Sequence, residues 1–173
     1  MDKKETIKSV TFILGGSLLQ MFNGIGGGWA SSLTAIFGMV LFFKGLSALK
    51  EGLDEAGQGG VKLLITAAIL SIIGFVFDII PLMGIVASII LLAAFIVELI
   101  GFLKLKASAS IGEDGKKGIS LLLVAMVLGI VNSILGLIPV IGAIVGSIVS
   151  IIALALVFFG WIKVQEGLMN NAQ

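Results

Sequence analysis

Two apolar stretches of this 173-residue chain repeat one another, and the repetition limits what the chain can fold into. Residues 60–106 and 118–163 are largely apolar, and each stretch has a proline near its middle, Pro81 or Pro139. These are the only prolines in the sequence, and they lie 58 residues apart (139 − 81 = 58). A proline lacks the amide hydrogen that a helix interior needs. Each stretch therefore predicts two helices folded back on each other at the proline.

The length and composition of these helices predict that they cross a membrane. About 20 helical residues span a hydrocarbon core ~30 Å thick. Residues 63–77 contain only apolar residues, Gly, Ser and Thr, and Glu98 is the only ionisable residue within 82–103. Charged residues make up 12% of the chain, against about 25% in soluble proteins, and the mean hydropathy is +1.22. The alternation of apolar and polar residues that a β-barrel requires is missing.

The N-terminal part has the same outline as the two later stretches. Lysines precede an apolar run, an uncharged bend, a second apolar run and a further lysine. The glycine-rich residues 23–28 replace the proline at this bend. We therefore expect an all-α polytopic membrane protein, a single domain with six transmembrane helices. They would form three tandem αα hairpins over residues 5–50, 60–106 and 118–165, joined by polar cytoplasmic linkers at 50–60 and 106–118.

An alternative for the N-terminus is a cleaved signal peptide. Its positive start and short apolar run fit one, with a cleavage site near Gly28-Trp29-Ala30. A retained first helix is favoured because the hairpin outline continues to Lys50.

Local signals also predict helix ends and interface residues. The residue before a proline disfavours the α conformation, so Ile80 should end one helix and Pro81 should begin the next. Tryptophan favours the boundary between lipid and water, so we expect Trp29 at one interface and Trp161 at the opposite one.

The distribution of lysines predicts the orientation. All eleven basic residues are lysines, found at the N-terminus, near the linkers or towards the end of the final helix, and none is at a bend. Lysines flanking membrane spans are retained in the cytoplasm. We therefore expect a cell (inner) membrane protein with both termini cytoplasmic and Asp78 as the only outer charge.

Each linker contains an acidic pair, Asp54 with Glu55 and Glu113 with Asp114. Paired carboxylates can bind a hard cation, but the ligand spacing of an EF-hand is missing. The preferred interpretation is a solvated segment that caps the following helix, and no metal site is predicted.

The residue inventory argues against catalysis. The sequence has no His, Cys, Arg or Tyr, so the usual triads, zinc sites and arginine clamps cannot form. We predict no enzyme activity, no catalytic residue and no cofactor. The expected partners are membrane lipid and further copies of the chain, without nucleic acid.

Three polar residues within the spans are candidates for a functional site. Glu98 lies six residues before Lys104, or ~9 Å deeper along the helix. A carboxylate at that depth is costly when ionised and is typical of a proton-coupled transporter, although it could instead be hydrogen-bonded to a neighbouring helix. Gln20 and Asn132 should also face inward, where they could line a polar path or join helices.

Small residues recur at four-residue spacing in several spans and predict close helix packing. Such faces could mediate homo-oligomerisation or a gating seam, or could pack helices within the chain. The glycines concerned are Gly38, Gly84, Gly129, Gly142 and Gly146.

Three αα hairpins with proline bends resemble the HdeD-like acid-resistance membrane proteins and other small prokaryotic families. The residues that carry this resemblance are Pro81, Pro139, Gly84, Gly142, Gly101 and Gly160. The resemblance implies a small, non-enzymatic inner-membrane protein. We accordingly expect a structural or stress-related role through oligomerisation or partner binding; a channel or proton-coupled transporter using Glu98 is the alternative.

Overall fold

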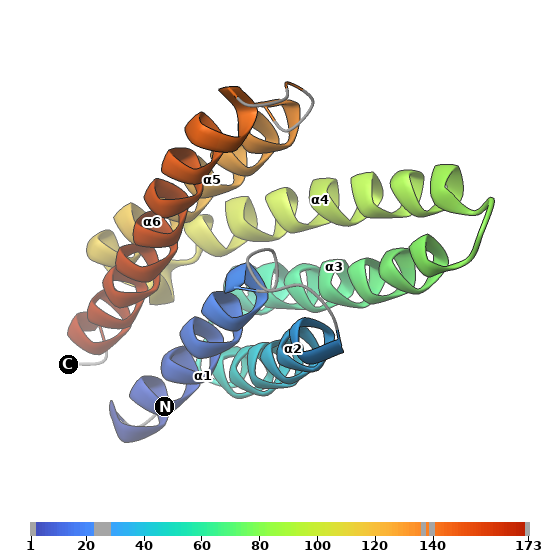
Figure 1. The fold of residues 1–173 in the computed structure, drawn as a ribbon. Helices are drawn as coiled ribbons and strands as arrows, with labels where there is room; N and C mark the ends of the chain where they lie inside the picture. Colours follow the sequence, from blue (N-terminus) through green and yellow to red (C-terminus); the bar gives the residue numbers. More distant parts are fainter. Residues whose placement is uncertain (1–2, 23–28, 136–137, 139–140, 172–173) are drawn as a thin grey trace.

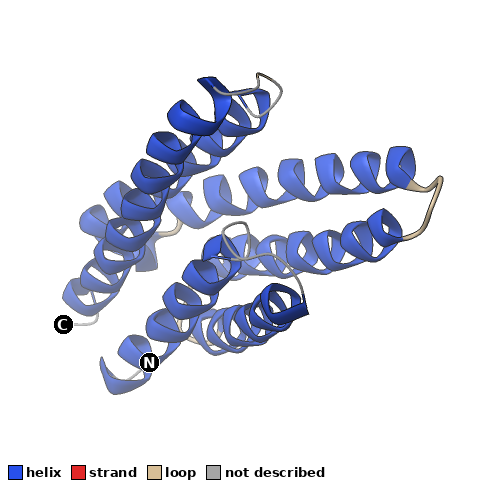
Figure 2. Ribbon diagram, in the orientation of Figure 1, coloured by secondary structure: helices blue, strands red, loops and turns tan. Residues whose placement is uncertain are grey.

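The fold is all helical in the residues that the computed structural model describes, 3–22, 29–135, 138 and 141–171 (Figures 1 and 2). Side chains are described within these ranges except at residues 3, 22, 29–33, 35–36, 78–79 and 141–143. The elements are α1 (Lys3–Phe22), α2 (Trp29–Lys50), α3 (Glu55–Ile79), α4 (Gly84–Ala107), the 3₁₀ helix η1 (Ala109–Ile111), α5 (Gly112–Leu135) and α6 (Ile141–Asn171). The all-α prediction is confirmed.

Four of these helices are long and apolar enough to cross a membrane. The candidate spans within the described residues are Glu55–Phe77, Gly84–Ala107, Ala109–Leu135 and Ile144–Asn171. At most 28% of the 18-residue window that defines each span is buried inside the molecule. Large apolar side chains in these spans are exposed, among them Phe75, Ile89 and Ile151, as lipid contact requires. α1 and α2 are not among these four, and the six-span topology stays a prediction.

The turn between α3 and α4 differs from the predicted one. α3 ends at Ile79, but α4 begins at Gly84 and not at Pro81. The amide of Met83 donates to the carbonyl of Ile80 at 3.1 Å, and Leu82 between them has φ +70°. Proline followed by a residue with positive φ is typical of a type II turn, which keeps Pro81 outside both helices. Pro139 and residues 23–28 of the other two bends lie outside the described residues.

The linkers are shorter than predicted, because α3 begins at Glu55 and α5 at Gly112. Asp54 shows why α3 begins there: its Oδ1 accepts from the amide of Gly57 at 2.8 Å, which confirms the capping prediction. The same carboxylate also accepts from the Ser108 hydroxyl at 2.5 Å and from the Ala109 amide at 2.8 Å. One side chain therefore joins the α2–α3 connection to the α4–α5 connection.

Consecutive helices pack in three pairs, α1 with α2, α3 with α4 and α5 with α6, and the pairs close into a ring. α2 contacts α3, α4 contacts α5, and α6 returns to contact α1. Both termini lie at one end of the molecule, and the α3–α4 turn lies far from them (Figure 1). We call the end with the termini the terminal end.

One glycine in each pair allows the two helices to approach closely. A Cβ added at Gly45 would lie 2.5 Å from the Ile13 side chain, and one at Gly101 would lie 2.9 Å from Leu64. At Gly160 the corresponding contact is Leu122, at 2.8 Å. All three distances are shorter than real Cβ contacts, so only glycine fits these positions without rearrangement.

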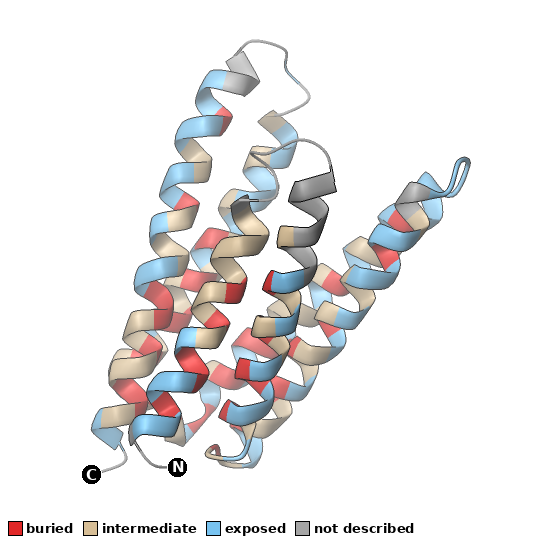
Figure 3. Ribbon diagram, turned by 60° about the horizontal axis from the view of Figure 1, so that its bottom comes forward, coloured by how far each residue is buried: buried red, intermediate tan, exposed pale blue. Residues whose placement is uncertain are grey.

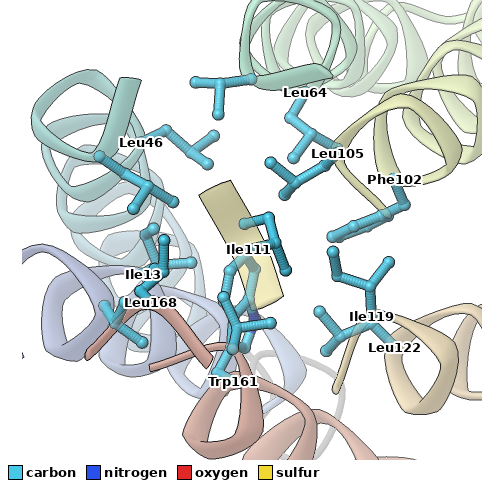
Figure 4. Packing of buried hydrophobic residues seen from close by; sticks show 14 of the residues in the cluster. Ile13, Leu46, Leu64, Phe102, Leu105, Ile111, Ile119, Leu122, Trp161 and Leu168 are labelled. Atoms are coloured by element: carbon cyan, nitrogen blue, oxygen red, sulfur yellow. The ribbon is translucent and has the colours of Figure 1, made fainter. Parts of the chain in front are cut away.

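The buried core lies towards the terminal end, where the three pairs meet (Figure 3). Ile13, Leu64 and Leu122, which pack on those glycines, all belong to it. The residue after each glycine also belongs to it, namely Leu46, Phe102 and Trp161 (Figure 4). Trp161 is 1% exposed, so its predicted interface position is wrong. Its position directly after Gly160 directs the indole into the ring centre.

The glycine contacts predict opposite effects at two neighbouring residues. A Cβ at Gly60 would lie 2.6 Å from the Leu105 amide nitrogen and 2.8 Å from the Gly101 carbonyl, whereas a Cβ at Gly59 has no described atom within 4 Å. Backbone atoms cannot rotate away, so Gly60→Ala should destabilise the fold by about 1–3 kcal/mol. Gly59→Ala should be neutral or stabilising by up to about 1 kcal/mol. Thermal unfolding in detergent, followed by circular dichroism, measures both, and equal stabilities would contradict this packing.

The Asp54 contacts predict a loss of stability in acid. The Ser108 hydroxyl, together with the amides of Gly57, Ala109 and Ser110, holds the pKa of Asp54 below its ordinary value of 3.8. A lowered folded-state pKa adds stability above the ordinary value, and this stability is lost as the pH falls through the folded-state pKa. Asp54→Asn should lower the free energy of unfolding by about 1–3 kcal/mol at neutral pH. It should also make that free energy less dependent on pH below about pH 4. Glu55→Gln is the matched control. If Asp54→Asn loses stability in acid as the parent does, Asp54 is not the cause of that loss.

Candidate functional site

A cavity of about 960 Å³ lies between the helix pairs, and residues from all six α-helices line it. Seven of its lining residues also belong to the buried core, so the cavity adjoins the core directly; they are Phe42, Leu64, Phe102, Leu122, Ala125, Ala153 and Trp161. Its other lining residues include Gln20, Ser71 and Gly146, which are further from the terminal end along their helices. The core therefore lies next to the cavity on its terminal side.

The structure brings together the three polar residues that the sequence singled out. Gln20 from α1, Glu98 from α4 and Asn132 from α5 all line this cavity. Each is partly exposed and none is fully buried, as expected for side chains at a cavity wall. Their inward direction was predicted from the cost of exposing amides and a carboxylate to lipid.

Glu98 occupies a position that is apolar in the other two helix pairs. It precedes Gly101 by three residues, as Phe42 precedes Gly45 and Val157 precedes Gly160. All three residues line the cavity. Because the glycines hold equivalent contacts in their pairs, Glu98 replaces an apolar side chain at one of three equivalent wall positions.

The carboxylate of Glu98 is the only ionisable group lining the cavity in the described part of the chain. The helices that surround it contribute no lysine and no second acid to the wall. Within the same residues, Glu98 has no hydrogen bond or salt bridge to another side chain or to the backbone. The described residues therefore show no hydrogen bond from Glu98 to a neighbouring helix, and its role stays a prediction.

Two aromatic rings form the cavity wall next to the core. Phe102 and Trp161 have ring centroids 6.1 Å apart at an interplanar angle of 55°, and both line the cavity. Figure 4 shows both rings among the buried side chains at the ring centre. Phe102 follows Glu98 by four residues, so it lies on the same helix face, ~6 Å nearer the terminal end. We call Phe102 and Trp161 the aromatic floor.

A hydrogen bond between α5 and α6 accounts for Asn132. Its Nδ2 donates to the Ser150 hydroxyl at 3.1 Å. A Cβ added at the neighbouring Gly146 would lie 2.7 Å from Asn132 Oδ1, so that glycine leaves room for the amide. Asn132 therefore joins two helices and also presents polar atoms to the cavity.

The sequence did not identify the aromatic floor as part of a site. The sequence predicted Trp161 at the membrane interface and gave Phe102 no role. Aligning the hairpins on Gly45, Gly101 and Gly160 could have shown the pattern, because it places Leu46, Phe102 and Trp161 at equivalent positions.

The glycines predicted to pack helices divide into two groups. Gly38 lies against α1, its Cβ position 2.9 Å from the Gly16 carbonyl, and Gly146 lies against Asn132. Gly84 and Gly129 have no described atom within 4 Å of a Cβ, so packing within the chain is wrong for them. Gly84 adjoins the exposed turn, and Gly129 faces the cavity. The surroundings of Gly142 and of the Asp78 side chain lie outside the described residues.

The second acidic pair does not form an isolated anionic site. Glu113 and Asp114 lie in the first turn of α5 and form ion pairs with Lys116 and Lys117 at 2.8 and 3.2 Å. Among the side chains that the structure describes, no group of three acidic residues could hold a metal ion.

Comparison with known proteins gives no relative, because no family model, curated protein or solved structure matches the chain.

Proposed function

We propose that this protein is a small multi-pass transporter of the cell membrane, with Glu98 as its proton-binding and solute-binding group. One observation carries the proposal: a cavity of about 960 Å³ lies between the helices, and Glu98 provides the single carboxylate in the described part of its wall. A protein with only a structural role has no need for such a cavity, and filling it with side chains would add contacts.

The topology that we propose is six spans in three hairpins with both termini cytoplasmic. The retention of lysines in the cytoplasm supports this orientation, as does the position of both termini at one end (Figure 1). In it, the core lies next to the cavity on its cytoplasmic side, and the cavity extends towards the outer bends.

The carboxylate gives this cavity a means of coupling. An unpaired carboxylate away from bulk water is costly when ionised, so it favours binding either a proton or a cation. Exchange between these two states would link solute movement to proton movement. No enzymatic step and no cofactor are part of this proposal.

Flux in proteoliposomes tests the proposed transport. A pH-sensitive dye inside the vesicles reports proton movement while small cations, anions and neutral solutes are supplied outside in turn. For at least one solute, the parent should move protons faster than empty vesicles, and Glu98→Gln should reduce the rate at least about tenfold. Glu55→Gln removes a carboxylate outside the cavity and should behave as the parent. Absence of flux for every solute, or equal flux in Glu98→Gln, would refute the proposal.

Self-association in a structural or stress-related role, as in the HdeD-like resemblance, is the second candidate. The observation that favours it is the open surface at Gly84, which no described part of the chain covers. A second copy packing there would bring two backbones close together. Gly84→Leu should then lower the oligomer mass in native mass spectrometry, whereas Gly59→Leu should not. The same mass in both variants and in the parent would exclude this contact.

A further inference from the structure

We infer that the central cavity binds a lipophilic organic monocation, held by the Glu98 carboxylate within a largely apolar wall. This inference deepens the proposed function and rests on it, because it names the class of solute that the cavity takes.

The charge of the cavity selects a cation. Glu98 is the only ionisable residue in the described wall, and no lysine from any of the six helices reaches it. An anion would meet one negative charge and no positive one. A single monocation would neutralise the site, and the absence of a second carboxylate argues against a dication.

The remaining lining distinguishes an organic cation from an inorganic one. Mg²⁺ and Ca²⁺ take six or more oxygen ligands, and no cluster of three acidic side chains exists among the described residues. The Asn132 amide is already bonded to Ser150. The other polar side chains in the wall are neutral and are spread over α1, α3 and α6; they are Ser17, Gln20, Ser71, Ser147 and Ser150. With one carboxylate and a mainly apolar lining, the wall is a poor replacement for the hydration shell of a metal ion.

The apolar part of the wall suits the organic groups of such a cation. Phe102 lies on the same helix face as Glu98, about one helical turn away, and Met126, Leu128 and Leu154 also line the cavity. A cation bound here would place its charge near the carboxylate and its apolar groups against these side chains.

The size and adaptability of the cavity favour a bulky solute. Its volume of about 960 Å³ is near the upper end of pockets for drug-sized molecules, about 300–1,000 Å³. Met21, Met39 and Met126 also line it, and methionine side chains adapt readily to different apolar shapes. We therefore expect low selectivity among apolar cations.

Tetraphenylphosphonium is the probe, and tetraphenylborate is its matched control, with nearly the same shape and the opposite charge. Isothermal titration calorimetry on the full chain in detergent should show saturable binding of the cation and none of the anion. Glu98→Gln should weaken cation binding at least about tenfold. Glu98→Asp keeps the charge and should retain most of the affinity, and Glu55→Gln should match the parent.

The pH dependence gives a second readout at the same site. Protons compete with the cation for Glu98, so the affinity of the parent should fall as the pH is lowered. The residual binding of Glu98→Gln should not change with pH. Circular dichroism of each variant checks folding, and Glu98→Asp tests the charge if Glu98→Gln does not fold.

The outcomes separate this inference from the proposed function. Equal binding of both probes, or cation binding unaffected by Glu98→Gln, would overturn the inference. Glu98-dependent flux of another solute without phosphonium binding would overturn it and leave the proposed function standing. Glu98-dependent phosphonium binding without transport in proteoliposomes would confirm the binding site and refute the transport proposal.

Discussion

Close backbone approach at one glycine in each helix pair is the contact on which the rest of this structure depends. Lipid tails are as apolar as leucine, so helices in a bilayer gain little from burying apolar side chains. Dispersion contacts must hold them together, and these decay steeply with distance. Gly45, Gly101 and Gly160 let each pair approach closely enough for the next residue to reach the centre of the ring. Without these contacts, Leu46, Phe102 and Trp161 would not belong to one core.

The cavity follows from where those contacts are placed. Tight packing is concentrated towards the terminal end (Figure 3), and beyond it no described residue lies near a Cβ at Gly84 or Gly129. Helices that pack closely at one end and less closely beyond it leave a cavity between them. Glu98 lies in the wall of this cavity. The equivalent positions in the other pairs hold Phe42 and Val157. Three similar helix pairs therefore produce one charged wall and two apolar ones.

This asymmetry bears on how such a protein could work. A ring of three pairs with identical walls would hold three carboxylates or none, and three unpaired carboxylates in one cavity would repel one another. A single Glu98 on a largely apolar wall avoids that repulsion and still gives the cavity a charge to neutralise. The Asp54 contacts near the terminal end join the α2–α3 connection to the α4–α5 connection, so they resist separation of the helix pairs there.

The sequence by itself determined the helical class, the turn at Pro81 and the inward direction of Gln20, Glu98 and Asn132. Each of these follows from local chemistry: missing amide hydrogens, apolar length and the cost of exposing polar groups to lipid. Only the tertiary structure decided that the three polar residues share one cavity, that Trp161 is buried beside Phe102, and that Gly84 and Gly129 pack against no described neighbour. Those facts depend on how closely the helix pairs approach and at which position along their axes they contact one another. That position is set by contacts between residues far apart in the chain, which no local pattern specifies.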